Sequence, residues 1–297
     1  MRWYLYSLLT SLSFVGMVLC VRGLTNRGFA PKQILFFLIG FALLGFIGAT
    51  APSIQAVLKS DRFLGFLAAA SFAGVFATIG HLADFEAIKR APNPGFSISI
   101  RNCNILPVTI LSVFLFGSSL GVLKVLAALL ILGGIIALVL DRRASSVQEQ
   151  TTLHFWDSWV TLSMIASISF AFMVFGMKQA TRLGFSPPEI MVINYIINFI
   201  VFAILCRKDL KGYLRDRSGL RFFLPVVFAA SLFAFVGNLL SVKGLELAPN
   251  PGYHEAIKNT NVLFVTLLAV PMFSANFDRQ KVLGVVSVVA GIVLLVI

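Results

Sequence analysis

The sequence has 297 residues, of which 58% are hydrophobic and only 12% are charged, and its mean hydropathy is +0.93. A soluble domain would be about a quarter charged, so the composition excludes an ordinary soluble protein. A net charge of +12 would indicate nucleic-acid binding in a soluble protein, but most Lys and Arg residues here stand at the ends of apolar runs. Such residues anchor and orient membrane helices, so we expect no nucleic-acid partner.

The cysteines argue against a metal or redox site, and the first residues of the chain argue against a signal peptide. Cys20, Cys103 and Cys206 stand far apart, without metal-ligand or redox spacing, and we interpret them as small apolar packing residues. The N-terminus runs directly into an apolar stretch of membrane-spanning length without a small-residue cleavage site. This pattern favours a first helix over a removed signal peptide.

Apolar runs near the ~20 residues needed to cross a bilayer fill almost the whole chain. They predict an all-α integral membrane protein with ten transmembrane helices and short connections. The predicted helices are 4–21, 31–50, 62–81, 95–116, 121–140, 158–178, 187–206, 220–241, 252–273 and 280–297.

An internal repeat organises these predicted helices. The pentapeptide Ala91–Gly95 recurs as Ala248–Gly252, and the segments that follow align without a gap, with about half of their positions identical. The same alignment continues without a gap to the C-terminus, and it pairs Lys124 with Lys281. The pentapeptide also predicts a turn, because proline ends the preceding helix and Asn250 would cap the next one.

The beginning of the chain repeats as well. Residues 11–18 match 167–174, and residues 25–31 match 181–187, so five helices are followed by a second copy of the same five. Because five is odd, the second copy must cross the membrane in the opposite direction, as in the inverted repeats of secondary transporters. The predicted organisation is a first repeat over 1–140, a linker over 141–157 and a second repeat over 158–297.

Small residues in the fifth and tenth predicted helices indicate a close helix contact in the membrane. They are Gly133, Gly134 and Ala137 in the first copy, and Gly284, Ser287 and Gly291 in the second.

Motifs in the fourth and ninth helices carry a family resemblance. Residues 106–111 read Leu-Pro-Val-Thr-Ile-Leu and residues 114–117 read Phe-Leu-Phe-Gly, and the second copy contains Leu-Phe-Val-Thr-Leu-Leu over 263–268. In these motifs the chain resembles the EamA-like ten-helix members of the drug/metabolite transporter superfamily. The resemblance covers nearly all of the chain and implies a secondary transporter, with no information about its substrate.

The chain also departs from that family. The family usually carries a Gly-Glu pair after the fourth and ninth helices, where this chain has Gly117-Ser118 and Ser274-Ala275. Any role of that glutamate is therefore absent. Conversely, Arg101 and Lys258 are similar to the basic residues that sugar-phosphate translocators of the same superfamily place in these two helices.

Arg101 and Lys258 are the first candidates for substrate binding. Each lies about two turns into its predicted helix, and inverted repeats would bring the two in from opposite faces to bracket a site at the midplane. The nearby helix N-termini would favour an anion. Alternatively, both side chains extend to the membrane surface and only anchor their helices.

Amide side chains are the second set of candidates, because an amide facing lipid would lose water without gaining a partner. They either line a substrate cavity or bond neighbouring helices. The substrate-binding candidates among them are Asn102, Asn104, Asn259 and Asn261, and a possible cavity pair, one turn apart, is Asn194 and Asn198.

Three further residues could line the cavity or couple transport to protons. His81 and Asp84 stand at the end of the third predicted helix, where we expect solvated charges bordering a loop. Glu255 stands three residues before Lys258 and is placed to pair with it. The sequence after His254 lacks the second histidine of a zinc-protease helix, so we expect no metal and no other cofactor.

These features together predict a secondary transporter of a small polar metabolite, with an anionic one favoured, working by alternating access in the cell (inner or plasma) membrane. An integral-membrane enzyme and a lipid-binding protein without transport are the alternatives. No nucleotide loop or nucleophile elbow is present in the sequence, so we expect no enzyme. The expected partners are a small-molecule substrate and the lipid bilayer, for a monomer or homodimer.

The sequence gives conflicting indications of orientation. The loops after odd-numbered helices hold about twice the Lys and Arg of the others, which would place the N-terminus outside. The resembling family has both termini in the cytoplasm.

Overall fold

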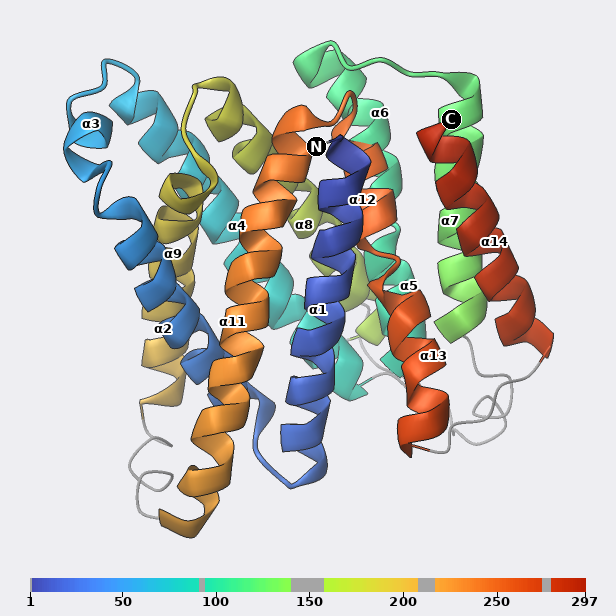
Figure 1. Ribbon diagram of the computed structural model, residues 1–297, viewed down its shortest axis with the longest axis horizontal. Helices are drawn as coiled ribbons and strands as arrows, with labels where there is room; N and C mark the ends of the chain where they lie inside the picture. Colours follow the sequence, from blue (N-terminus) through green and yellow to red (C-terminus); the bar gives the residue numbers. More distant parts are fainter. Residues whose placement is uncertain (1, 91–93, 140–157, 208–216, 274–278) are drawn as a thin grey trace.

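The computed structural model describes residues 2–90, 94–139, 158–207, 217–273 and 279–297. Every regular element in these ranges is a helix, and the helices stand together as one bundle with both ends of the chain at the same end of it (Figure 1). Seven of the described helices are long and apolar enough to cross a membrane, and two shorter apolar stretches accompany them. The prediction of an α-helical membrane protein is thereby confirmed.

The helices of the first half are α1 (Trp3–Asn26), α2 (Pro31–Thr50), α3 (Ile54–Leu58), α4 (Phe63–Arg90), α5 (Pro94–Asn102), α6 (Ile105–Phe116) and α7 (Val122–Val139). Those of the second half are α8 (Trp159–Arg182), α9 (Pro187–Cys206), α11 (Arg217–Leu247), α12 (Pro251–Lys258), α13 (Asn261–Phe273) and α14 (Arg279–Val296).

Two predicted helices are interrupted at matching positions. The helix predicted over 95–116 ends at Asn102 and resumes at Ile105, and the one predicted over 252–273 ends at Lys258 and resumes at Asn261. At both breaks the backbone forms tight turns with bonds to the third preceding residue, such as Cys103 N to Ile100 O at 3.0 Å. Interrupted backbone at membrane depth is tolerated where protein or a water-filled cavity surrounds it.

A second difference concerns the end of the third predicted helix. The prediction ended it at residue 81, with solvated charges bordering a loop, whereas α4 continues to Arg90. Asp84 therefore lies on a helix inside the bundle, and it is only 9% exposed. The expectation of a solvated Asp84 is wrong, since a charged residue does not by itself end a helix.

The predicted turn before α12 is present. The Asn250 side chain caps this helix by accepting a hydrogen bond from Gly252 N at 2.8 Å, and Pro251 occupies the first helical position. The Asn250 amide also donates to Thr109 O at 3.1 Å, which fixes the start of α12 against α6. The corresponding turn of the first half, at residues 91–93, lies outside the described residues.

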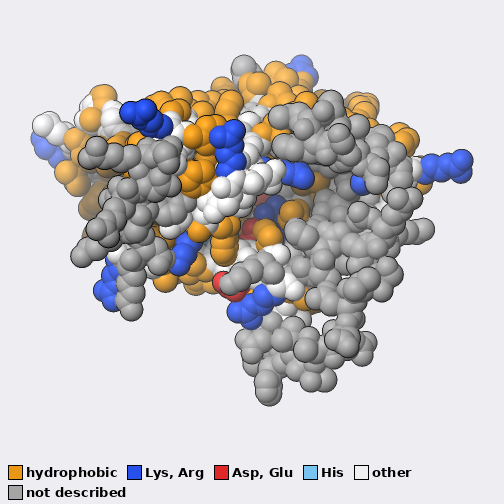
Figure 2. All heavy atoms as spheres, turned by 90° about the horizontal axis from the view of Figure 1, so that it is seen from below, with side chains coloured by type: hydrophobic (Ala, Val, Ile, Leu, Met, Phe, Trp, Pro, Cys, Tyr) orange, Lys and Arg blue, Asp and Glu red, His pale blue; other side chains and the backbone are white. Residues whose placement is uncertain are grey.

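Helices from the two halves of the chain pair along their lengths: α1 with α11, α4 with α8, α2 with α9, and α7 with α14. The buried core contains mainly Ala, Phe, Ile, Leu and Val side chains. Seen from the end opposite the termini, hydrophobic side chains cover much of the described surface, with Lys and Arg interspersed (Figure 2). Exposed side chains such as Leu64 and Phe114 suit contact with lipid.

The contact between α7 and α14 depends on glycine. A Cβ atom on Gly134 would lie 2.8 Å from Gly284 O, and one on Gly291 would lie 2.9 Å from Ala127 O. Gly133 has open space instead, so it lies outside the predicted small-residue contact.

We expect Gly134→Ala to destabilise the protein by about 1–3 kcal/mol, because the added methyl group forces α7 away from α14. The adjacent Gly133→Ala is the matched control and is expected to be neutral or slightly stabilising, since alanine has the higher helix propensity. Thermal unfolding in detergent measures both variants. Equal unfolding temperatures would contradict a close contact at Gly134.

Candidate functional site

A cavity of about 370 Å³ lies among α1, α2, α4, α8, α9 and α11 and reaches both helix breaks. Apolar side chains form much of its wall, including Phe14, Met17, Phe170 and Met173. All of the site residues predicted from the sequence line it except Asp84. They are Arg101, Asn102, Asn104, Lys258, Asn259, Asn261, His81, Asn194, Asn198 and Glu255. Their binding of a substrate remains a prediction.

The first charged group in the wall is an ion pair between α4 and α5. Arg101 Nη1 donates to Asp84 Oδ2 at 3.0 Å, and Arg101 Nη2 donates to Asn102 Oδ1 at 3.4 Å. His81 lies one turn before Asp84, with its ring 5.2 Å from the Phe170 ring. Asp84 is thus connected to the cavity through Arg101, although it does not line the wall itself.

The second charged group joins the two helix breaks. Lys258 forms the expected ion pair with Glu255, which is 2% exposed. The other carboxylate oxygen of Glu255 accepts from Asn104 Nδ2 at 3.4 Å, and Asn259 Nδ2 donates to Asn104 Oδ1 at the same distance. Asn104 therefore connects the turn after α5 with the turn after α12.

Both cations point into the bundle rather than toward its surface. The side chain of Lys258 is 13% exposed and that of Arg101 is 26% exposed, and each contacts a buried carboxylate. An anchoring role at the membrane surface does not fit this burial. The two ion pairs also leave this part of the wall without net charge.

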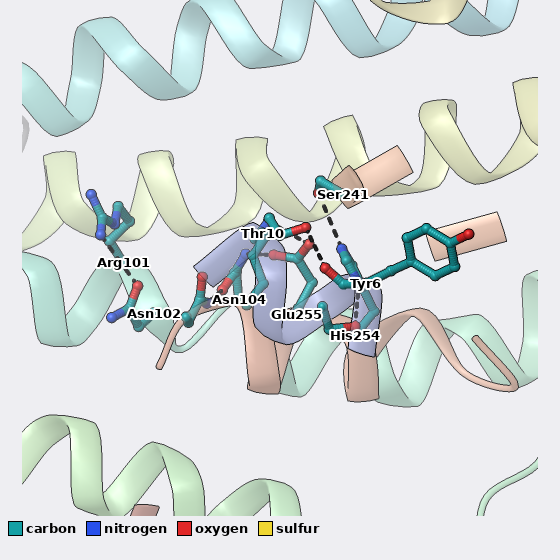
Figure 3. Close-up of polar contacts among 11 residues, drawn as sticks. Tyr6, Thr10, Arg101, Asn102, Asn104, Ser241, His254 and Glu255 are labelled. Carbon is teal, nitrogen blue, oxygen red and sulfur yellow. Dashed lines mark hydrogen bonds and ion pairs between the residues drawn. The ribbon is translucent and has the colours of Figure 1, made fainter. Parts of the chain in front are cut away.

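His254 supports the site from α12 without lining the cavity, a role that the sequence analysis missed. Its buried ring shares hydrogen bonds with Ser7 of α1 at 2.8 Å and with Ser241 of α11 at 3.1 Å (Figure 3). It holds α12 in place beside Glu255. The sequence signal was a polar residue near the start of a predicted membrane helix, and its partners are too distant in sequence to be recognised. The described residues contain no group of three or more potential metal ligands.

Lys178 was also missed, although it stands at the end of an apolar span. Its ammonium group donates to three main-chain oxygens at the end of α11: Leu245 O at 2.7 Å, Glu246 O at 2.9 Å and Ala248 O at 3.3 Å. A cation at a helix C-terminus satisfies carbonyl groups that have no partner within the helix. Lys178 thus fixes α8 to the end of α11, behind the cavity.

The amides of α9 form a pair. Asn198 Nδ2 donates to Asn194 O at 2.8 Å and to Asn194 Oδ1 at 3.1 Å. Among the described residues, nothing pairs with Asn194 Nδ2 or Asn198 Oδ1. Next to this pair, Asn238 of α11 donates through Nδ2 to the hydroxyl group of Tyr195 on α9 at 3.0 Å.

Cysteine labelling tests whether water reaches the helix breaks. We expect Asn104→Cys and Asn261→Cys to react with a water-soluble thiol reagent, because both positions line the cavity. Ala70→Cys is the control and should stay unreactive, since Ala70 is buried between helices away from the cavity. The three native cysteines are first replaced by serine. Inert cysteines at both 104 and 261 would indicate helix packing without solvent access.

The fold and the cavity define a multi-pass α-helical membrane protein with a polar interior site. Residues 157–297 match the model of the EamA-like transporter family. Over these residues the chain is similar to the EamA-like transporter family, whose members are membrane transporters of small molecules. The resemblance seen in the sequence motifs is thereby confirmed.

Other comparisons support the fold. No curated protein matches the sequence. Among solved structures, 27 chains match. One, a crystal structure, superposes with a TM-score of 0.72 at 17% identity, and the match covers 99% of this chain and 96% of that one. A structure at this identity shows that nearly the whole chain shares its fold.

Proposed function

We propose that the protein is a secondary transporter that moves a small polar metabolite across the cell (inner or plasma) membrane by alternating access. Two inverted repeats of five transmembrane helices would move against each other around the cavity. The observation that carries the proposal is the position of the cavity, which both halves of the chain line and which lies where the two helix breaks meet. Discontinuous helices at a central site are typical of secondary transporters.

Matching contacts between the halves support the repeat. The alignment pairs Ser7 with Ser163, and the contact of Ser7 with His254 has its counterpart in the 2.9 Å hydrogen bond from Ser163 to Ser97. Ser97 and His254 occupy the same repeat position. The same kind of interface therefore occurs on both sides of the cavity, as a two-fold relation requires.

Contacts of phenylalanine with glycine repeat in the same way. A Cβ on Gly80 would lie 2.7 Å from the Phe170 ring, and one on Gly237 would lie 2.7 Å from the Phe14 ring. The register pairs Gly80 with Gly237 and Phe14 with Phe170. Exchanging the conformations of the two repeats would give a mirrored state of similar energy, which alternating access needs.

A negatively charged group of the substrate would bind between Arg101 and Lys258. It would compete there with Asp84 and Glu255, which hold the two cations in the structure. When the substrate replaces these carboxylates, its binding free energy would be available to shift the two helix breaks. The hydrogen bond between Asn104 and Asn259 connects one break to the other.

Uptake into liposomes tests transport. Purified protein is reconstituted, incubated with a mixed pool of polar metabolites, and the trapped contents are measured by mass spectrometry. We expect enrichment of at least one solute over protein-free liposomes, and loss of that enrichment in Asn104→Trp, which fills the cavity. Ile110→Trp, on the exposed face of α6, should retain it. No enrichment by folded protein would favour a lipid-binding protein instead.

A further inference from the structure

The repeat makes the two helices α2 and α9 equivalent, yet their cavity faces differ in polarity. The register that pairs Pro31 with Pro187 also pairs Leu38 with Asn194 and Ala42 with Asn198. Leu38 lines the same cavity as the two amides, and Ala42 is buried in α2. Aliphatic side chains are therefore sufficient for packing at these positions of the repeat. The amides of α9 serve a purpose other than packing.

The two amides are buried but incompletely bonded. Asn194 and Asn198 are each 3% exposed, and each has one amide atom without a protein partner in the described part of the chain. The unpartnered atoms are a donor, Asn194 Nδ2, and an acceptor, Asn198 Oδ1. They lie close together, because the other two atoms of the amides bond each other at 3.1 Å.

A buried amide atom without a hydrogen-bond partner has lost water and gained nothing in return, so a ligand or water that bonds both atoms is strongly favoured. A single chemical group that presents an acceptor beside a donor would satisfy the pair at once. Carboxamides and the edges of cyclic amides have this arrangement. A ketone or ester has the acceptor alone.

We propose that Asn194 and Asn198 form a binding subsite for an uncharged, amide-like edge of the transported solute. The neighbouring part of the wall, formed by Leu35, Leu38 and Ile39 of α2, is aliphatic and would contact an apolar part of the same solute. The subsite lies on α9, separate from the ion pairs of α5 and α12. It recognises hydrogen-bonding pattern rather than charge.

The subsite rests on the proposed transport function for its biological role, but its binding can be tested alone. Hydrocinnamamide and benzylacetone have nearly the same shape, and only the former carries the amide donor. We expect detergent-purified protein to bind hydrocinnamamide at least about ten-fold more tightly by calorimetry, since a site built to bond a donor rejects an analogue that lacks it.

Two variants introduce the side chains that the first repeat has at the equivalent positions. Asn194→Leu and Asn198→Ala are expected to bind both probes with nearly equal affinity. Ser231→Ala is the control, because Ser231 is buried on α11 and donates to Val227 O of the same helix, and it should keep the preference.

The outcomes separate this inference from the transport proposal. Equal binding of the two probes by the unaltered protein, or a preference that survives in both asparagine variants, would overturn the subsite and leave water as the partner of these amides. A preference that depends on both asparagines supports the subsite, even if liposome uptake fails. Uptake that continues with no probe preference supports transport and removes the subsite.

Discussion

Lys258→Gln is expected to destabilise the folded protein by about 3–5 kcal/mol and to abolish transport. Glu255 would remain 2% exposed with no cation beside it, and removing one partner of a buried ion pair leaves an uncompensated charge. Thermal unfolding in detergent and uptake into liposomes measure the two effects. In Glu255→Gln/Lys258→Gln the buried charge is gone, so we expect most of the stability to return while transport stays impaired.

The Arg101–Asp84 pair provides the comparison. Arg101→Gln is expected to impair transport with a smaller loss of stability than Lys258→Gln, because the Asp84 side chain is 12% exposed and more easily reached by water. A Lys258→Gln protein that unfolds no earlier than Arg101→Gln would contradict the importance of burial. Normal transport by both variants would show that neither cation takes part in substrate binding.

Helix positions were predicted best where local sequence signals act alone. The predicted spans 31–50 and 187–206 have the same bounds as α2 and α9. Both helices begin with proline, and α9 adds a capping box in which Ser186 N donates to Glu189 Oε2 at 2.8 Å. Proline and caps fix a helix start without help from the rest of the chain.

The helix breaks could not be predicted from local signals. Residues 102–104 read Asn-Cys-Asn and residues 259–261 read Asn-Thr-Asn, with neither proline nor glycine. Asparagine costs a helix interior only about 0.7 kcal/mol or less relative to alanine, so a continuous apolar helix was the simpler prediction. The breaks depend on contacts across the bundle, such as Asn259 with Asn104, whose partners lie far apart in the sequence.

Site residues were predicted best where the sequence repeat pairs polar positions in two apolar segments. Arg101, Lys258 and their neighbouring amides all line the cavity. His254 was missed because its role depends on Ser7 and Ser241, which only the tertiary fold brings together. The repeat predicts where a polar side chain lies, and the particular fold decides what it contacts.

One close backbone contact helps to fix the position of α12, and with it of Glu255 and Lys258. A Cβ atom on Gly252 would lie 1.9 Å from Thr109 Oγ1 and 2.6 Å from Thr109 Cα. Thr109 is buried on α6, and its carbonyl oxygen accepts from Asn250 directly before the helix. Neither helix can yield without loss of that hydrogen bond.

We therefore expect Gly252→Ala to destabilise the protein by about 3 kcal/mol or more, beyond the usual range for overpacking, and to abolish uptake. Gly48→Ala is the control, because Gly48 has open space around it. Adding Thr109→Ala should not rescue the variant, since the contact with the Thr109 backbone persists. Gel filtration and thermal unfolding in detergent measure the outcome. A Gly252→Ala protein as stable as Gly48→Ala would show that α12 is free to move away from α6, and the fixed placement of the Glu255–Lys258 pair would then be wrong.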